Sequence, residues 1–271
     1  MKILLIGGTG FIGTYLYEDL CIRNTVDRTY AKSSIEGGTH YDVAQHSIDE
    51  IIKAQYDLVI NNINPLSLSY QQVGKAIEEL TAACKKYHSR LINISSLSAD
   101  GQNKFNDSYS MKKHIADEII MSEMQGYNYT ILRFPQVFDY KGKAKKTQAG
   151  LYFLIDAIKK SEPISLFVNS GTMFRNYIPI DILISSVNYT MEKNISGLHN
   201  VYVPAHTSSL RNIINLFAEM NPNYDTTAML QKGEKQGQTY YIPPVSEQFD
   251  EWSKSFRDLK YYLSKTFHEY Q

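Results

Sequence analysis

Cysteine is scarce in this chain of 271 residues, which contains only Cys21 and Cys84 and no CxxC pair. A disulfide framework or a zinc site is therefore not expected, no other metal site is indicated, and a reducing compartment fits. Long apolar runs are missing as well: the first one, residues 3–6, is followed by glycines, and none reaches the length of a membrane span. These absences predict a cytoplasmic protein without a signal peptide or a membrane anchor.

An excess of either charge is also absent. Lys and Arg number 28, Asp and Glu number 28, and the formal net charge is zero. This balance gives no electrostatic reason to expect nucleic acid or a membrane surface as a partner. The apolar fraction is 43%, and the length suits one large domain or one domain with a smaller appendage. We therefore expect a soluble globular protein.

What the sequence does contain begins with its first residues, MKILLIGGTGFIG. A short apolar strand, residues 3–6, leads into a glycine turn and then into a segment with helical spacing of apolar residues, 14–23. Glycines let the backbone approach a pyrophosphate closely, and the free amide groups at a helix start face its negative charge. The spacing Gly-x-x-Gly-x-x-Gly differs from the common Gly-x-Gly-x-x-Gly, but its place between strand and helix predicts a dinucleotide site. The residues predicted to hold the cofactor here are Gly7, Gly10, Phe11, Ile12 and Gly13.

No acidic residue follows the second predicted strand, about 25–31. A carboxylate at that place binds the adenosine ribose hydroxyls and selects NAD, whereas residues 31–34 here read AKSS. The Lys32 cation and the hydroxyl groups suit a ribose phosphate, so NADP is favoured over NAD. An ordinary polar loop with Lys32 in solvent would show the same pattern. Farther along, Asp42 either accepts a hydrogen bond from the adenine amino group or caps a turn.

Strands and helices alternate through the first half of the chain. Strands are predicted near 39–43, 56–60, 91–94 and 127–132, and helices over 67–87 and 109–123. This alternation predicts an α/β fold with a doubly wound, Rossmann-like parallel sheet. Ligands of such sheets bind beyond the carboxyl ends of the strands, where the glycine turn, Asn61 and Ser95 fall. Asn61 and Ser95 are therefore predicted to lie beside the cofactor, as is the polar segment 61–65.

A lysine-rich loop, residues 141–146 (KGKAKK), marks the expected boundary between two regions. Residues 1–147 are predicted to form the dinucleotide-binding domain and 148–271 a smaller substrate-binding region. Residues from about 174 to 203 are expected to pack back onto the first domain. The elements predicted after the boundary are helices over 150–160, 182–193 (capped by Asp181), 208–220 and 252–267, and strands over 164–168, 174–180 and 199–203.

Tyr109 and Lys113 lie one helical turn apart on one face of a predicted helix, with Asp107 or Ser108 as its cap. A tyrosine ordinarily ionises near pH 10, but a nearby ammonium and the positive charge of an oxidised nicotinamide favour the phenolate. Lys113 is also placed to bond the nicotinamide ribose. A serine from the end of the preceding strand would polarise the substrate oxygen while hydride moves to or from the same carbon.

With these residues the chain resembles the extended short-chain dehydrogenases/reductases of the NAD-dependent epimerase/dehydratase type, which act on nucleotide sugars. The matching segments occur in the expected order over about two thirds of the chain and are GGTGFIG (7–13), INISSLSADG (92–101), YSMKK (109–113), LRFPQVFD (132–139) and FRNYIPIDI (174–182). The resemblance implies a Rossmann-like fold and an enzyme that uses NAD or NADP. It also implies a homodimer formed through helices that include the one with Tyr109.

The resemblance assigns roles by position. Ser96 would be the catalytic serine and contact the substrate, Tyr109 the acid/base and Lys113 its partner. Three further positions correspond to residues that contact ligands in the family. These are Pro135 beside the nicotinamide amide, Gln136 in place of an asparagine near the substrate, and Arg175 at the nucleotide-sugar diphosphate.

The departures from the family pattern narrow the expected reaction. Dehydratases carry an acidic pair after the catalytic hydroxyl, whereas this chain has Leu97 and Ser98, which disfavours dehydration. Asp100 replaces the usual tyrosine, and Tyr109 follows Ser96 by only 13 residues. The leading hypothesis is an NADP-dependent reductase of a keto group on a nucleotide-linked deoxysugar. A nucleotide-sugar 4-epimerase with tightly bound NAD is the alternative enzyme, and a non-catalytic dinucleotide-sensing regulator is the alternative of another class.

Overall fold

A computed structural model describes residues 1–32, 34–63 and 66–271. Ser33, Asn64 and Pro65, which took part in the predictions for the ribose-phosphate loop and the polar segment, lie outside the described residues. The chain divides into two compact units. The first comprises Met1–Phe134 and Ile184–Val201, and the second comprises Pro135–Leu183 and Tyr202–Gln271.

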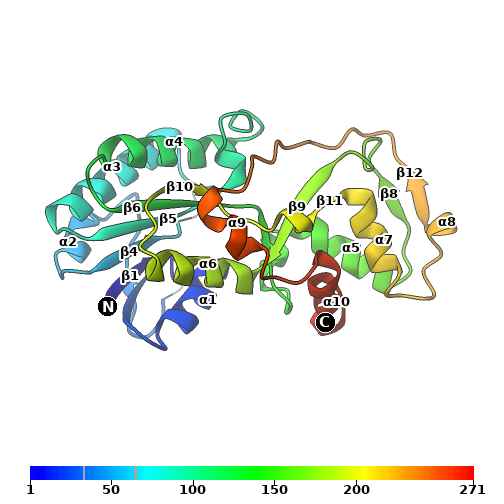
Figure 1. Ribbon diagram of the computed structural model, residues 1–271, viewed down its shortest axis with the longest axis horizontal. Coiled ribbons are helices and arrows are strands. Elements are labelled where there is room, and N and C mark those ends of the chain that lie inside the picture. Colours follow the sequence, from blue (N-terminus) through cyan, green and yellow to red (C-terminus); the bar gives the residue numbers. More distant parts are fainter. Residues whose placement is uncertain (33, 64–65) are drawn as a thin grey trace. The chain divides into compact units, whose positions relative to one another are not determined.

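The first unit is built on a seven-stranded sheet in which the paired strands run parallel (Figure 1). The strand order is β10-β6-β5-β4-β1-β2-β3. The bounds are β1 Lys2–Ile6, β2 Thr25–Tyr30, β3 Thr39–His40, β4 Leu58–Asn61, β5 Arg90–Ser96, β6 Tyr129–Phe134 and β10 Gly197–Asn200. Strands β1 and β4 are almost wholly apolar and buried, as strands covered on both faces must be. The predicted Rossmann-like α/β class is confirmed.

Helices cover both faces of this sheet (Figure 1). One face carries α2 (Asp49–Ile52), α3 (Tyr70–Lys86) and α4 (Ser108–Glu123), and the other carries α1 (Phe11–Leu20) and α6 (Ile180–Glu192). Asn188 of α6 donates to the Asp19 carboxylate of α1 at 2.8 Å, which places these two helices side by side. The core under α2, α3 and α4 includes Leu4, Ile6, Ile52, Val59, Val73, Ile77, Leu80, Leu91, Ala116, Ile120 and Ile131.

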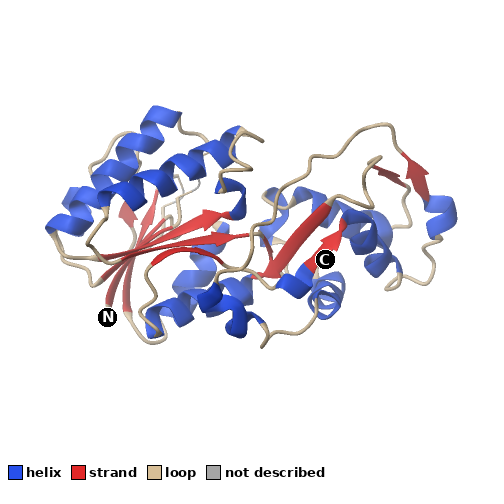
Figure 2. Cartoon of the chain, turned by 45° about the horizontal axis from the view of Figure 1, so that its top comes forward, coloured by secondary structure: helices blue, strands red, loops and turns tan. Residues whose placement is uncertain are grey.

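The second unit contains two small sheets among helices (Figure 2). One sheet has the order β11-β9-β7 and the other pairs β12 with β8. The strand bounds are β7 Gln136–Phe138, β8 Ile164–Leu166, β9 Phe174–Pro179, β11 Thr207–Ser209 and β12 Leu230–Lys232. The helix bounds are α5 Ala149–Lys159, α7 Leu210–Ala218, α8 Thr226–Met229, α9 Glu247–Ser253 and α10 Leu259–Glu269.

The predicted last helix, 252–267, is wrong in one respect, because the chain forms two helices there, α9 and α10. The Asp258 side chain accepts the backbone N–H of Tyr261 at 2.9 Å, so a new helix starts at that point. The predicted cap at Asp181 is also wrong. Helix α6 already begins at Ile180, and Asp181 instead accepts a hydrogen bond from the Tyr140 hydroxyl at 2.8 Å.

The ends of the compact units differ from the ranges expected from the sequence. The first stretch of chain in the first unit ends with β6 at Phe134, and the lysine-rich loop 141–146 lies within the second unit. There the fully buried Asp139 carboxylate accepts the backbone N–H groups of Lys141, Lys143 and Ala144, at 2.8–3.1 Å. Strand β10 and most of α6 belong to the first unit, whereas β9 belongs to the second.

Candidate active site

The glycine turn joins β1 to α1 and depends on glycine at two points. Gly7 has a φ of +77°, and a Cβ there would lie 2.8 Å from the carbonyl oxygen of Asn62. A Cβ on Gly13 would lie 2.2 Å from the carbonyl oxygen of Gly7, so only glycine lets α1 start this close to the strand. Gly10 is the N-cap of α1 and supplies no side-chain acceptor to the first-turn N–H groups, which suits an anion. Phe11 and Ile12, also predicted to hold the cofactor, form the first turn of the helix.

The residues predicted to contact the adenosine half are close to the same edge of the sheet. Lys32 is exposed directly after β2. The Asp42 carboxylate accepts the backbone N–H of Ala44 at 2.9 Å, so it caps a turn after β3 in this structure. Its contact with adenine, and that of Lys32 with a ribose phosphate, stay predictions.

Strand β5 and helix α4 bring Ser96 and Tyr109 together. Asp107 caps α4 by accepting the Ser110 N–H at 2.7 Å, which confirms one of the two predicted caps and fixes the start of the helix. The Ser96 side chain hydrogen-bonds with that of Tyr109. On its other side, the Ser96 hydroxyl oxygen accepts hydrogen bonds from the N–H and the hydroxyl of Ser98, at 3.2 and 3.0 Å.

Lys113 is buried under the same face of α4. Its ammonium donates to the backbone carbonyls of Ile63, at 3.1 Å, and Ile94, at 2.9 Å. Burial lowers the pKa of Lys113 to about 8, against an attraction to Asp117 that raises it. Burial raises the pKa of Tyr109 to about 12, although the hydrogen bond with Ser96 works in the opposite direction. Without a further positive charge nearby, Tyr109 is therefore a protonated donor at neutral pH.

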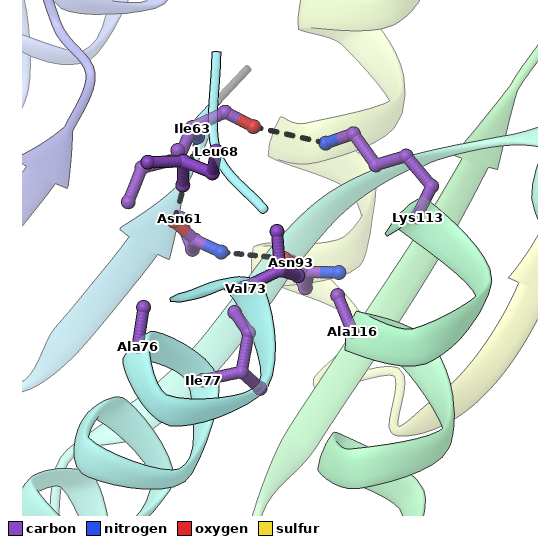
Figure 3. Close-up of a pocket in the computed structure, with 9 residues that line it drawn as sticks. All are labelled: Asn61, Ile63, Leu68, Val73, Ala76, Ile77, Asn93, Lys113 and Ala116. Atoms are coloured by element: carbon purple, nitrogen blue, oxygen red, sulfur yellow. Dashed lines mark hydrogen bonds between the residues drawn. The ribbon is translucent and has the colours of Figure 1, made fainter. Parts of the chain in front are cut away.

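A pocket adjoins Lys113 between the sheet and helices α3 and α4 (Figure 3). Its wall is apolar on the helix side except for Lys113, and polar on the sheet side, where Asn61 ends β4 and Asn93 lies within β5. The Asn61 amide donates to the side-chain oxygen of Asn93 at 2.8 Å, and the Asn61 oxygen accepts the Ile63 N–H at 3.4 Å. The lining residues are Asn61, Ile63, Leu68, Val73, Ala76, Ile77, Asn93, Lys113 and Ala116. Asn61 thus lies near Lys113, and its contact with a cofactor stays a prediction.

A buried acidic residue beneath this site did not stand out in the sequence. Asp117 is one turn beyond Lys113 on α4, and its side chain is fully buried. It accepts hydrogen bonds from Ser95 at 2.9 Å and from Asn93 at 3.2 Å, and pairs with the Arg133 guanidinium at 2.7 Å. The signal that could have revealed Asp117 is its spacing of four from Lys113 and eight from Tyr109, which puts all three on one helix face.

The remaining predicted residues belong to the second unit and are described within it. Pro135 and Gln136 stand at the start of β7, and Gln136 Oε1 is buried without a hydrogen-bond partner among the described residues. Arg175, on β9, donates to the backbone oxygens of Phe174 and Gln238 and lies 5.0 Å from the centre of the Tyr240 ring. Their contacts with nicotinamide or substrate stay predictions.

Within the parts of the chain that the structure describes, no group of three or more His, Cys, Asp or Glu side chains is arranged to hold a metal ion. No helix among those residues is long and apolar enough to cross a bilayer.

A comparison with known protein families identifies the family of this chain. The model of the NAD dependent epimerase/dehydratase family matches residues 3–203, nearly three quarters of the chain. The chain belongs to this family. Membership makes it an enzyme of the epimerase/dehydratase type and implies an NAD or NADP cofactor, as the resemblance predicted. The start of α1 agrees, because its N-cap Gly10 has no side chain, and among the described residues a Cβ there would meet only the Gly7 carbonyl oxygen, at 3.5 Å. No curated protein sequence is a significant match to the chain.

Solved structures share the fold at low sequence identity. A UDP-N-acetylglucosamine 4-epimerase from Methanobrevibacter ruminantium is 17% identical, with a TM-score of 0.76 and coverage of 98% of this chain and 97% of that one. A dTDP-glucose 4,6-dehydratase from Bacillus anthracis, in complex with NAD, is 14% identical, with a TM-score of 0.77 and coverage of 99% and 96%. A hypothetical dTDP-4-dehydrorhamnose reductase from Sulfolobus tokodaii is 17% identical, with a TM-score of 0.70 and coverage of 100% and 97%.

Proposed function

We propose that this family member is an NADP-dependent reductase of a keto group on a nucleotide-linked deoxysugar. The observation that carries the proposal is the Ser96–Tyr109 hydrogen bond above a buried Lys113, with no carboxylate at Leu97 or Ser98. The site therefore contains the proton donor that a reduction needs and lacks the carboxylate pair that a dehydration needs. The likeness to a hypothetical dTDP-4-dehydrorhamnose reductase supports the same class.

The cofactor would be held by the glycine turn, with Lys32 at a ribose phosphate and Lys113 at the nicotinamide ribose. When bound, it supplies the hydride that goes to the carbonyl carbon. The two hydrogen bonds from Ser98 occupy the acceptor side of the Ser96 oxygen, so the Ser96 proton points away from Ser98, toward Tyr109 or a substrate oxygen. Tyr109, protonated at neutral pH, donates its proton to the oxygen that becomes the alcohol. The Lys113 ammonium stabilises the phenolate that remains.

The test is NADPH consumption by the purified protein with a dTDP- or UDP-linked 4-keto-6-deoxyhexose. Tyr109→Phe should lower kcat by about 10²–10⁴-fold, because it removes the proton donor, while NADPH still binds. Tyr127→Phe is the matched control, since Tyr127 is an exposed tyrosine in the loop after α4. Equal turnover by the Tyr109→Phe variant and the wild type would refute the role of Tyr109. Binding of NADPH without turnover of any such sugar would refute the substrate class.

A nucleotide-sugar 4-epimerase is the second candidate, and the likeness to UDP-N-acetylglucosamine 4-epimerases favours it. An epimerase oxidises and re-reduces the same carbon, so it keeps its NAD bound between turnovers. Oxidised NAD released on denaturing the freshly purified protein would support this candidate against the reductase. A non-catalytic sensor of dinucleotides would need neither Tyr109 nor Lys113, both of which the chain retains.

A further inference from the structure

The carboxylate of Asp117 lies where three elements of the first unit meet. It is on α4, it accepts hydrogen bonds from two side chains of β5, and it pairs with Arg133 of β6. The exposed fraction of its side chain is 0% and that of Arg133 is 7%. A buried carboxylate with this many partners costs desolvation and is retained only where its charge or its contacts are needed. The catalytic roles proposed for Ser96, Tyr109 and Lys113 do not use it directly.

We propose that Asp117 is a positioning residue that holds the end of β5 against the face of α4 that carries Tyr109 and Lys113, and that keeps the neighbouring Lys113 amine charged. The proposal rests on the proposed roles of Tyr109 and Lys113 in the same site. Ser95 precedes Ser96 in the chain, so the hydrogen bond from Ser95 to Asp117 fixes the strand end that carries the Ser96 hydroxyl. Lys113 donates to the carbonyl of Ile94, the residue before Ser95, so both α4 side chains engage the same short segment.

The charges around Asp117 explain why one carboxylate is needed there. Lys113 and Arg133 both place cations in this buried region, from α4 and from β6. Asp100, which lies 3.7 Å from the far side of the Arg133 guanidinium, is partly exposed and compensates that end. Among the residues that the structure describes, Tyr109 is a further titratable group that interacts with Asp117, and a phenolate there would add a second negative charge. The negative charge of Asp117 therefore compensates the positive charge of Lys113 as long as Tyr109 is protonated and neutral.

The electrostatic influence has a definite sign. Asp117 raises the pKa of Lys113, whereas burial lowers it to about 8. Without the carboxylate, burial would act on Lys113 unopposed, and a larger share of the amine would be neutral at neutral pH. A neutral amine cannot stabilise the Tyr109 phenolate. The loss of Asp117 would therefore slow the proposed proton transfer, although Asp117 does not contact the substrate.

The experiment follows Lys113 by NMR in full-length protein labelled with ¹³C at the lysine ε carbons. The Lys113 signal is the one that Lys113→Arg removes. In Asp117→Asn its titration midpoint should fall by about one pKa unit or more relative to the wild type, which is a tenfold change in the ionisation equilibrium. Asp117→Glu, which keeps the charge, should restore most of the shift. Glu118→Gln is the matched control, because Glu118 is the next residue on α4 and is exposed.

The outcomes separate this proposal from the proposed function, because no substrate or cofactor is needed. An unchanged Lys113 midpoint in folded Asp117→Asn would overturn it, as would an equal shift in Glu118→Gln. If Asp117→Asn does not fold, a second wild-type sample, labelled with ¹³C at the aspartate carboxyl carbons, still decides: the Asp117 carboxyl carbon should show the shift of an ionised group at pH 7, and a protonated carboxyl there would overturn the proposal. A confirmed shift in a protein that reduces no keto sugar would leave Asp117 in this role and refute only the substrate class.

Discussion

Gly13→Ala should destabilise the first unit and weaken dinucleotide binding. The added Cβ would lie 2.2 Å from the carbonyl oxygen of Gly7 and 2.8 Å from the Cα of Gly8. Both are backbone atoms, so the clash is relieved only by moving the turn away from α1. Overpacking of this kind costs about 1–3 kcal/mol, and a severe contact belongs at the upper end of that range. Alanine returns about 1 kcal/mol through its helix propensity, which leaves a net loss near 2 kcal/mol.

For a chain of this size such a loss lowers Tm by about 4–8 °C. Movement of the turn should also remove at least one backbone hydrogen bond to the bound pyrophosphate, and so weaken NADPH binding by about tenfold or more. Tm is measured by calorimetry on the cofactor-free protein, and affinity by the change in NADPH fluorescence.

Gly10→Ala is the control that separates packing from ligand contact. A Cβ on Gly10 would be 3.5 Å from the nearest described atom, the carbonyl oxygen of Gly7, which is an ordinary contact. Its Tm should therefore fall by less than about 4 °C, because less than about 1 kcal/mol is lost at an N-cap that changes from glycine to alanine. Its NADPH affinity should fall, because the methyl group stands in the place proposed for the pyrophosphate. A Gly13→Ala protein with the wild-type Tm would refute the steric reasoning.

Three further changes test other parts of the molecule. Ala31→Asp should move the ratio of NADPH to NADH dissociation constants toward NADH by about tenfold or more, because a carboxylate repels a ribose phosphate and accepts the ribose hydroxyls; an unchanged ratio would remove the case for Lys32. The pKa of Lys113 is about 8 in the folded chain and 10.5 ordinarily, so between pH 8 and 10.5 the unfolded chain binds a proton that the folded chain does not. The contribution of Lys113 to the free energy of unfolding therefore becomes more favourable as the pH rises through this range. The free energy of unfolding of the wild type relative to Lys113→Met, from urea titrations, should therefore increase from pH 8 to pH 10, and a constant difference would contradict the lowered pKa. Asp139→Ala should cost about 3 kcal/mol in urea unfolding, because three backbone N–H groups of the loop lose their buried acceptor; a loss below about 1 kcal/mol would show that water replaces the carboxylate.

The parts of the fold that the sequence predicted are those with local signals. The run from Ile3 to Ile6, the glycines after it and the alternation of strands and helices indicated a parallel sheet, and the structure has one. Tyr109 and Lys113 were recognisable because their spacing of four depends only on helix geometry. Their closeness to Ser96 followed from Ser96 ending a strand at the same edge, and the structure contains that hydrogen bond.

The parts that were missed depend on contacts between distant residues. Asp117 looks like one more polar residue in an ordinary helix until β5 and β6 bring Ser95 and Arg133 to it. The lysine-rich stretch 141–146 was interpreted as a linker from its charge alone, whereas Asp139 organises it through backbone hydrogen bonds that composition does not indicate. The break before α10 did have a local sign, since Asp258 is a good N-cap.

The pairing of β10 with β6 has a consequence for how the chain folds. Residues 184–201 complete the first sheet only after residues 135–183 have been synthesised. Until then the edge of β6 has no neighbour on that side, and the Arg90 guanidinium lacks the carbonyls of Thr190 and Ile195 to which it donates at 3.1 and 2.7 Å. Contacts this far apart in sequence slow folding, and an uncovered strand edge invites pairing with another chain. The nascent protein is therefore most prone to aggregation after β6 has been made and before β10 is complete, while the ribosome makes residues 135–200.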